Sequence, residues 1–160
     1  MIKRKSLALL ISHISVAIVA FASGVYSLPI LMAPHSPSEN EIRTVSQSAQ
    51  YRTAFTRDLQ DSDWLHYGEG EVFISQQAIA FSGKLAPGPD YTVYFSPQFL
   101  ETEADFHRLN TQMVAVAKVK TFNDFLVTIP PNISVENYNT VLIWCDAFGQ
   151  FITAAQYQPD

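Results

Sequence analysis

The chain has 160 residues, enough for one ordinary domain, of which 48% are apolar and 16% are charged. This composition excludes a disordered polar chain, a collagen-like repeat and a highly charged coiled coil. Residues 1–34 hold three basic and no acidic side chains, whereas residues 35–160 hold 7 basic and 15 acidic ones, or −8. A body this acidic lacks the basic surface that nucleic acids require, so we expect no nucleic-acid partner.

The N-terminal sequence predicts a membrane anchor. Three basic residues, Lys3 to Lys5, precede an apolar stretch from Leu7 to Ala33 that no charged residue interrupts. About 20 helical residues suffice to cross the apolar core of a bilayer, and this stretch is longer. We therefore predict a single transmembrane helix over residues 6–33, with the basic segment 1–5 in the cytoplasm and the rest of the chain in the periplasm or outside the cell.

A cleaved signal peptide is the alternative to this anchor. Ala20-Phe21-Ala22 is an acceptable small-x-small cleavage site, and cleavage near Ala22 would produce a secreted protein. The apolar stretch continues well beyond this site, which a signal peptide does not need, and this favours the uncut anchor. The two interpretations differ in the mature N-terminus, because cleavage would leave a chain that begins near Ser23.

Residues 34–57 are predicted to form a linker that contains a helix. Residues 34–41 are rich in proline and polar side chains, as in a connection beside a membrane. Ser38 followed by Glu41 is a capping-box pattern, which marks the start of a helix. The apolar residues that follow, Ile42, Val45, Ala49 and Phe55, are loosely spaced for one helical face, so we expect a helix over about residues 39–57.

From residue 58 onward the pattern changes to short strand-like segments separated by turns, which predicts a β domain over residues 58–160. The expected strands are Gly68–Ser75, Ala78–Phe81, Tyr91–Phe95, Met113–Val119, Phe125–Ile129, Thr140–Cys145 and Phe148–Ala155. One helical segment, Glu101–Asn110, interrupts them. About seven short strands at close spacing are typical of an antiparallel β-sandwich or a small barrel, so we predict an all-β fold of one of these types.

The sequence contains no motif of the common hydrolases, kinases or dehydrogenases, so we do not expect an enzyme of these classes and assign no cofactor. The candidates for chemistry are His66, His107, Cys145 and Asp146. We expect His107 to be solvated on a helix face. A metal shared by His66 and Cys145 would need both side chains within about 4 Å of one ion. The sequence does not place them there, and no metal site is predicted.

Three stretches of the domain form a characteristic pattern. They are Trp64-Leu65-His66-Tyr67-Gly68-Glu69-Gly70-Glu71-Val72, Gly88-Pro89-Asp90-Tyr91-Thr92-Val93-Tyr94-Phe95-Ser96 and Tyr138-Asn139-Thr140-Val141-Leu142-Ile143-Trp144-Cys145-Asp146-Ala147-Phe148. In this order, over residues 58–157, the chain resembles the DM-thirteen domain, also called the electron-transfer DM domain. The third stretch is the most specific. One departure is Thr121-Phe122-Asn123-Asp124, where the family commonly has a glycine-containing turn.

The resemblance implies an all-β extracytoplasmic domain with a redox or electron-transfer role centred on Cys145. We take His66 as a candidate neighbour of this thiol, and a redox partner or an envelope protein as its partner. The alternative is a non-catalytic binding or assembly module of the cell envelope. In that case the loops Ala86–Asp90 and Phe99–Asp105 would contact the partner.

The residues around Cys145 favour an unreactive thiol. Cys145 has the same strand parity as Val141 and Ile143, so its side chain should point into an apolar face. Reactive cysteines usually lie in electropositive surroundings, and no basic residue lies within about ten positions of Cys145. The local pattern and the family resemblance therefore point in opposite directions, and a histidine packed against the thiol would favour the redox role.

Overall fold

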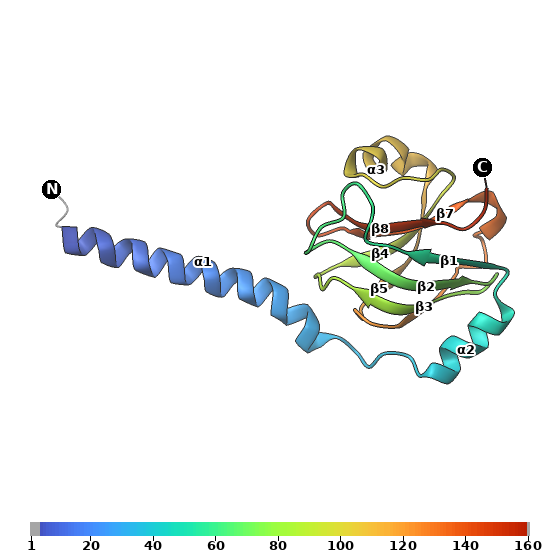
Figure 1. Cartoon of the computed structure of the whole chain (residues 1–160), viewed down its shortest axis with the longest axis horizontal. Coiled ribbons are helices and arrows are strands. Elements are labelled where there is room, and N and C mark those ends of the chain that lie inside the picture. The colour runs from blue at the N-terminus through green and yellow to red at the C-terminus, as the bar shows by residue number, and fades with distance from the viewer. Residues whose placement is uncertain (1–3, 160) are drawn as a thin grey trace.

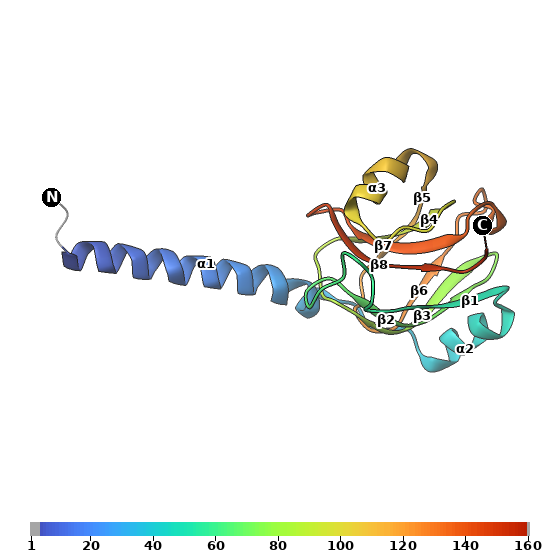
Figure 2. The same ribbon diagram turned by 45° about the horizontal axis from the view of Figure 1, so that its top comes forward.

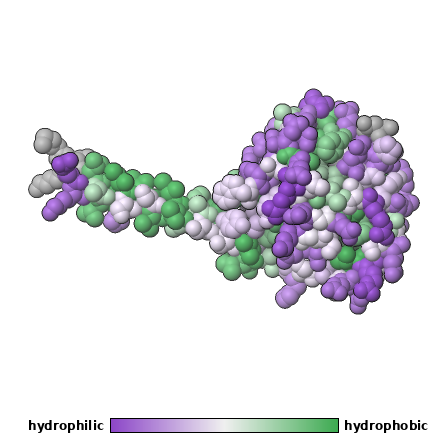
Figure 3. Space-filling view, viewed as in Figure 1, coloured by the Kyte–Doolittle hydropathy of each residue, from purple (hydrophilic) through white to green (hydrophobic). Residues whose placement is uncertain are grey.

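The structure is a computed structural model that describes residues 4–159, so Lys3 and the rest of residues 1–3 of the predicted cytoplasmic segment lie outside the described residues. Helix α1 (Arg4–Met32) projects from a β domain, and none of its residues is buried (Figure 1). By length and composition α1 can cross a membrane, and a signal sequence near the N-terminus would meet the same criterion. Its surface is mostly apolar, in contrast to the polar surface of the domain (Figure 3).

A short extended segment, residues 33–38, connects α1 to helix α2 (Glu39–Ser48). The predicted capping box at the start of α2 is confirmed. The Ser38 side chain accepts a hydrogen bond from the Glu41 backbone N–H, and the Glu41 carboxylate accepts one from the Ser38 backbone at 2.8 Å. These bonds satisfy backbone donors that the first helical turn would otherwise leave unpaired, which fixes where α2 begins.

The predicted extent of this helix, residues 39–57, is wrong. The backbone becomes extended at Ala49, and Tyr51–Phe55 forms strand β1. Along β1 the burial of the side chains alternates, and the strand ends with Phe55 in the core. This period of two is that of a strand with one face buried, and of the apolar residues assigned to the helix only Phe55 lies in the strand.

Eight strands form two antiparallel sheets of four strands each. Sheet A has the order β1-β2-β3-β6 and adds to β1 the strands Gly68–Ile74, Ala78–Leu85 and Phe125–Thr128. Sheet B has the order β5-β4-β7-β8, with strands Val114–Val119, Tyr91–Ser96, Thr140–Cys145 and Gln150–Gln156. The predicted all-β antiparallel sandwich is confirmed, with β1 as the additional strand. The alternative of a small barrel is wrong, because the two sheets do not close.

The inner faces of the two sheets enclose the main apolar core. The rings of Phe55, Phe81 and Phe125 from sheet A contact one another in sequence, with centroids 5.5 and 5.0 Å apart. Val141 and Ile143 of β7 face them from sheet B. All six residues of β7 are buried, as expected of a central strand.

A helix covers the outer face of each sheet (Figure 2). On sheet A, Ile42 of α2 packs with Phe73 and Ala80. On sheet B, the ring of Phe106 from helix α3 (Glu103–Leu109) stacks on Trp144 with a centroid distance of 3.7 Å. Two short 3₁₀ turns, Asn110–Gln112 and Val135–Asn137, complete the domain. Because a helix covers part of each outer face, the loops at the ends of the sandwich are the first place to look for a site.

Candidate functional site

A cavity of about 680 Å³ lies between one end of the sandwich and α1. Its walls come from residues 21–27 of α1, from residues 64–66, from residues 87–89 and from the turn between β7 and β8. Most of the lining is apolar. Tyr91 and Cys145, at the adjoining ends of β4 and β7, also line it. Residues of all three family stretches therefore line the cavity, and those of the third come from its end.

Cys145 closes the core at this end of the sandwich. It shares the core with Val141 and Ile143, as its strand parity predicts, and only 2% of its surface is exposed. Burial raises the pKa of the thiol above its ordinary value, and the backbone groups of Phe148, Asp90 and Ala147 oppose this rise only in part. The side chain is therefore a protonated thiol at neutral pH, held against an apolar cavity.

His66 is held in the cavity wall by a tight loop. The Asp63 carboxylate accepts hydrogen bonds of 2.7 Å from the backbone N–H groups of Leu65 and His66, and it lies 3.1 Å from Nδ1 of the His66 ring. Burial works to raise the pKa of Asp63, but these hydrogen bonds lower it below its usual value. In the tautomer that donates from Nδ1 to this carboxylate, Nε2 is the hydrogen-bond acceptor of the His66 ring.

The structure brings His66 and Cys145 to one cavity without a direct bond between them. Both line the cavity, and no hydrogen bond joins their side chains within residues 4–159. Over the same residues, no group of three or more His, Cys, Asp or Glu side chains could hold a metal ion. His107 lies elsewhere, exposed on α3 as expected, with its ring edge-on to Trp144 at 5.7 Å.

Gly88 of the second family stretch has a clear role in shaping this cavity. A side chain at this position would place its Cβ within 2.5 Å of Cζ in the Tyr91 ring. Tyr91 has no room to move, because its ring is buried and its hydroxyl donates a 2.8 Å hydrogen bond to the Ala86 carbonyl. Glycine therefore lets the loop lie directly on the tyrosine, which joins the cavity wall to the core.

The departure from the family pattern at Thr121–Asp124 is compensated by side-chain hydrogen bonds. The Thr121 hydroxyl donates to the Asp124 carbonyl at 2.8 Å, and the Asp124 carboxylate accepts from the Gly83 backbone N–H at 3.0 Å. These bonds hold the turn between β5 and β6 and tie it to β3. Polar side chains thus hold this connection in place of the glycine-containing turn that the resemblance led us to expect.

Sequence reasoning missed a polar cluster on the opposite face of sheet B. Lys118 Nζ lies 2.6 Å from the Asp90 carboxylate and 2.8 Å from the Asp146 carboxylate, which also accepts hydrogen bonds from the Thr92 and Tyr94 hydroxyls. Burial works to raise the pKa of Asp146, but the bonds from Lys118, Thr92 and Tyr94 lower it. The hydrogen bonds to Asp146 and Asp90 raise the pKa of Lys118.

The comparisons with known proteins identify the domain. A model of the electron transfer DM13 family matches residues 58–157, which include both His66 and Cys145. The chain belongs to this family. No curated protein and no solved structure shows a significant match. The DM13 match begins at residue 58, so α2 and β1 lie in front of the matched region.

Proposed function

We propose that this protein is an electron-transfer domain anchored to a membrane by α1, with its N-terminus in the cytoplasm and its DM13 domain in the periplasm or outside the cell. The observation that carries the proposal is the cavity that the DM13 region forms with α1, in which His66 and Cys145 both lie. The uninterrupted apolar surface of α1 supports the anchor.

In this proposal Cys145 exchanges electrons with the disulfide of a partner protein, because a lone cysteine has no second thiol within the chain. His66 takes the thiol proton, and the resulting thiolate attacks one sulfur of the partner disulfide. A bond forms between Cys145 and that sulfur while the partner's own S–S bond breaks, and the second partner sulfur leaves as a thiolate. Cys145 is thereby oxidised into a mixed disulfide with the partner, and the partner sulfur that leaves is the one that is reduced to a thiolate.

The pKa of Cys145 explains why a base is required. Burial keeps the thiol protonated at neutral pH, so it reacts only when its proton is removed. His66 is a basic group lining the same cavity, and Asp63 orients its ring. The proposal therefore gives His66 the role of converting a resting thiol into a nucleophile.

The second candidate function is a non-catalytic binding module of the cell envelope, and the burial of Cys145 favours it. A thiol that is 2% exposed behaves as a small apolar side chain, and the cavity would then bind part of a partner without any redox step. Of the two loops expected to meet a partner, Ala86–Asp90 borders the cavity and Phe99–Asp105 leads into α3.

Alkylation of the full chain in vesicles at neutral pH separates these two functions. Cys145 is the single cysteine of the chain, so every label reports on it. For the electron-transfer role we expect labelling of the folded protein that slows at least about tenfold in His66→Ala, as loss of a general base typically costs about a hundredfold or more. The matched control is His107→Ala, whose histidine lies outside the cavity.

Labelling that is equally slow in the wild type and in His66→Ala, and that becomes rapid only after unfolding, would favour the binding module. For the binding module we also expect the Cys145→Ala variant to function in cells as the wild type does. The anchor is tested separately by alkaline carbonate extraction and by the intact mass of the mature chain. A protein that begins near Ser23 and is released from membranes would be a cleaved, secreted one.

A further inference from the structure

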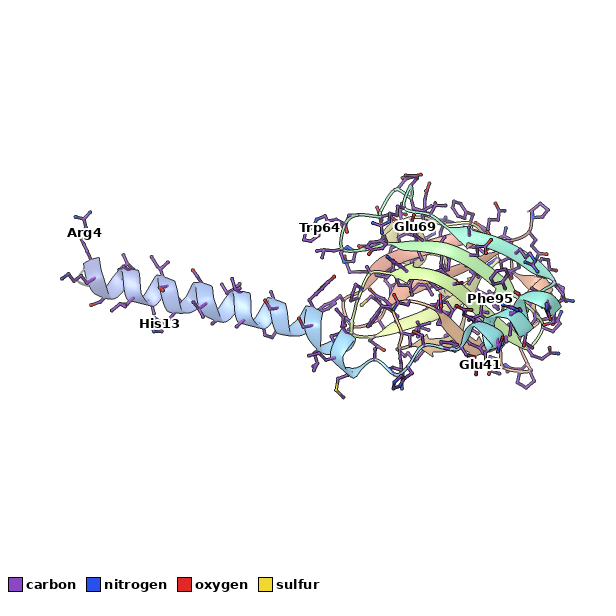
Figure 4. The ribbon with its side chains drawn as sticks, turned by 60° about the horizontal axis from the view of Figure 1, so that its bottom comes forward. Arg4, His13, Glu41, Trp64, Glu69 and Phe95 are labelled. Atoms are coloured by element: carbon purple, nitrogen blue, oxygen red, sulfur yellow. The ribbon has the colours of Figure 1, made fainter. Side chains whose placement is uncertain are left out.

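Exposed aromatic side chains of the DM13 domain lie at the cavity. In the described residues outside α1, three large apolar side chains are exposed: Trp64 at 79%, Phe148 at 58% and Phe99 at 39%. The two most exposed of these line the cavity together with α1. Trp64 projects from the end of the domain that faces the helix (Figure 4). Exposed aromatic side chains at one end of an otherwise polar domain mark an interaction surface.

The position of the cavity along α1 indicates the depth in a membrane at which the cavity end of the domain lies. The predicted span over residues 6–33 is longer than the apolar core of a bilayer, which takes about 20 helical residues. Counted from Leu7 beside the basic residues, the core ends near residue 26, and the rest of the span lies in the outer headgroups. The cavity is lined by residues 21–27 of α1. The loops that carry Trp64 and Phe148 therefore lie at the boundary between the apolar core and the headgroups on the outer side.

We propose that this end of the sandwich, formed by Trp64, Leu65, Pro87 and Phe148, docks on the outer leaflet of the bilayer and that its phospholipids fill the space between α1 and the domain. This docking end rests on the proposed anchoring by α1. Trp64 sits among the headgroups with its ring toward the acyl chains, the position that tryptophan prefers at membrane interfaces.

Two features favour lipid over a protein as the occupant. The docking end is continuous with α1, so the medium that surrounds the anchor also reaches these loops. The tips at residues 64–65, 87–89 and 147–149 carry no charged side chain, although the domain as a whole is strongly acidic. Loops without charge enter an interface at little cost, whereas each buried carboxylate would oppose insertion.

Docking makes the cavity an opening toward the membrane. A molecule that reaches Cys145 then passes between α1 and the docking end, through the interface rather than through bulk water. Reagents and partners that partition into the bilayer consequently have the shorter route to the thiol. The docking end thus selects for apolar or membrane-bound reaction partners.

Tryptophan fluorescence of the reconstituted full chain tests the docking directly. The chain has two tryptophans, Trp64 at the docking end and Trp144 buried under α3. Trp144→Phe leaves Trp64 as the sole emitter, and Trp64→Phe is the matched control that leaves Trp144. In vesicles of phosphatidylcholine with brominated acyl chains, we expect about a twofold or greater loss of Trp64 emission relative to plain lipid, because brominated chains quench only tryptophans at or below the interface. Trp144 emission should not change.

The proposal is overturned if Trp64 emits as in water, is quenched by aqueous iodide and is insensitive to brominated lipid while the chain resists carbonate extraction. Release of the chain from the vesicles on carbonate extraction would instead overturn the proposed anchoring by α1. An emission shift that depends on protein density in the vesicles would assign the surface to a second copy and also overturn the proposal. If Trp144→Phe does not fold, the difference between wild-type and Trp64→Phe spectra gives the Trp64 signal.

Discussion

Cys145 and Asp146 are neighbours at the end of β7, yet they occupy opposite electrostatic environments. Cys145 faces the apolar core and the cavity, where burial raises the pKa of its thiol. Asp146 points to the other face of sheet B, where Lys118 and the hydroxyls of Thr92 and Tyr94 bind its carboxylate. Although burial acts on both groups in the same direction, the pKa of Asp146 falls below its usual value.

The difference shows that burial alone does not decide the charge state of a side chain. A group that is removed from water keeps its charge only if hydrogen bonds and opposite charges replace the lost solvation. The outer face of sheet B supplies a cation and two hydroxyl donors, whereas the inner face supplies Cys145 only with backbone groups that offset its burial in part. The change of side between two consecutive residues follows from the strand period of two, as one residue faces inward and the next outward.

The sharpest test of this comparison is to place a carboxylate on the inner face by Cys145→Asp. No lysine or arginine of the described residues lines the cavity beside it. We therefore expect a loss of about 3 kcal/mol or more in the free energy of unfolding at neutral pH, relative to Cys145→Ala. The folded-state pKa of the new carboxyl will lie above its unfolded value, so stability should return as the pH falls toward that value. Urea unfolding at about pH 7 and about pH 5 measures both effects.

Cys145→Ala is the control for this variant, and its stability relative to the wild type should be the same at both pH values. A Cys145→Asp protein as stable as Cys145→Ala at neutral pH would contradict the assignment of the inner face as an environment without a charge partner. It would instead indicate that a cation or water reaches the carboxylate through the cavity.

The two tyrosines of β4 extend the comparison to neutral groups. Tyr91, on the inner face, donates to the Ala86 carbonyl at 2.8 Å, and its phenol is buried. Tyr94, on the outer face, donates to Asp146 at 3.1 Å and is half-buried. We expect Tyr91→Phe to cost about 1–2 kcal/mol in unfolding free energy and Tyr94→Phe about half as much, because water can replace only the outer bond. Equal costs in urea unfolding would argue against this difference in solvation.

The smallest expected effect comes from removing the cation of the outer cluster by Lys118→Met. Because Lys118 is half exposed, we expect a cost of about 1 kcal/mol at neutral pH. The pKa of Asp146 is lower in the folded than in the unfolded state, so its ionised carboxylate contributes stability at pH values above the unfolded-state pKa. This contribution is lost as the pH falls through the folded-state pKa. The cost of the variant should therefore shrink toward about pH 3, with the exposed Lys84→Met as the control in urea unfolding. A cost that is independent of pH would show that Lys118 acts only through packing.

The sequence was sufficient to predict the features that depend on local periodicity. The alternation of β7 placed Cys145 on the same face as Val141 and Ile143, and the structure confirms it. Ser38 and Glu41 marked the start of α2 because a capping box involves residues only three positions apart. The family stretches were recognisable because each is a continuous segment, and the DM13 match confirms their origin.

What could not be predicted depends on which strands are neighbours. Lys118 meets Asp90 and Asp146 because β4 pairs with both β5 and β7, and nothing in the sequence determines that order. The cavity was missed for the same reason, since its walls come from segments far apart in the chain. Strand β1 was missed because Ala49 and Phe55 fit a helical face as well as they fit the transition into a strand.

The six extended residues 33–38 between α1 and α2 limit how far the domain can move from its anchor. A fully extended chain of this length reaches only about 20 Å, less than the diameter of a small domain. With α1 in a membrane, the domain cannot search the bulk solution for a partner. It meets other proteins by lateral diffusion within a thin layer at the membrane surface, where a tethered pair experiences a high effective concentration. Weak contacts are then sufficient for frequent encounters, and a partner that is not itself held at the membrane is at a disadvantage.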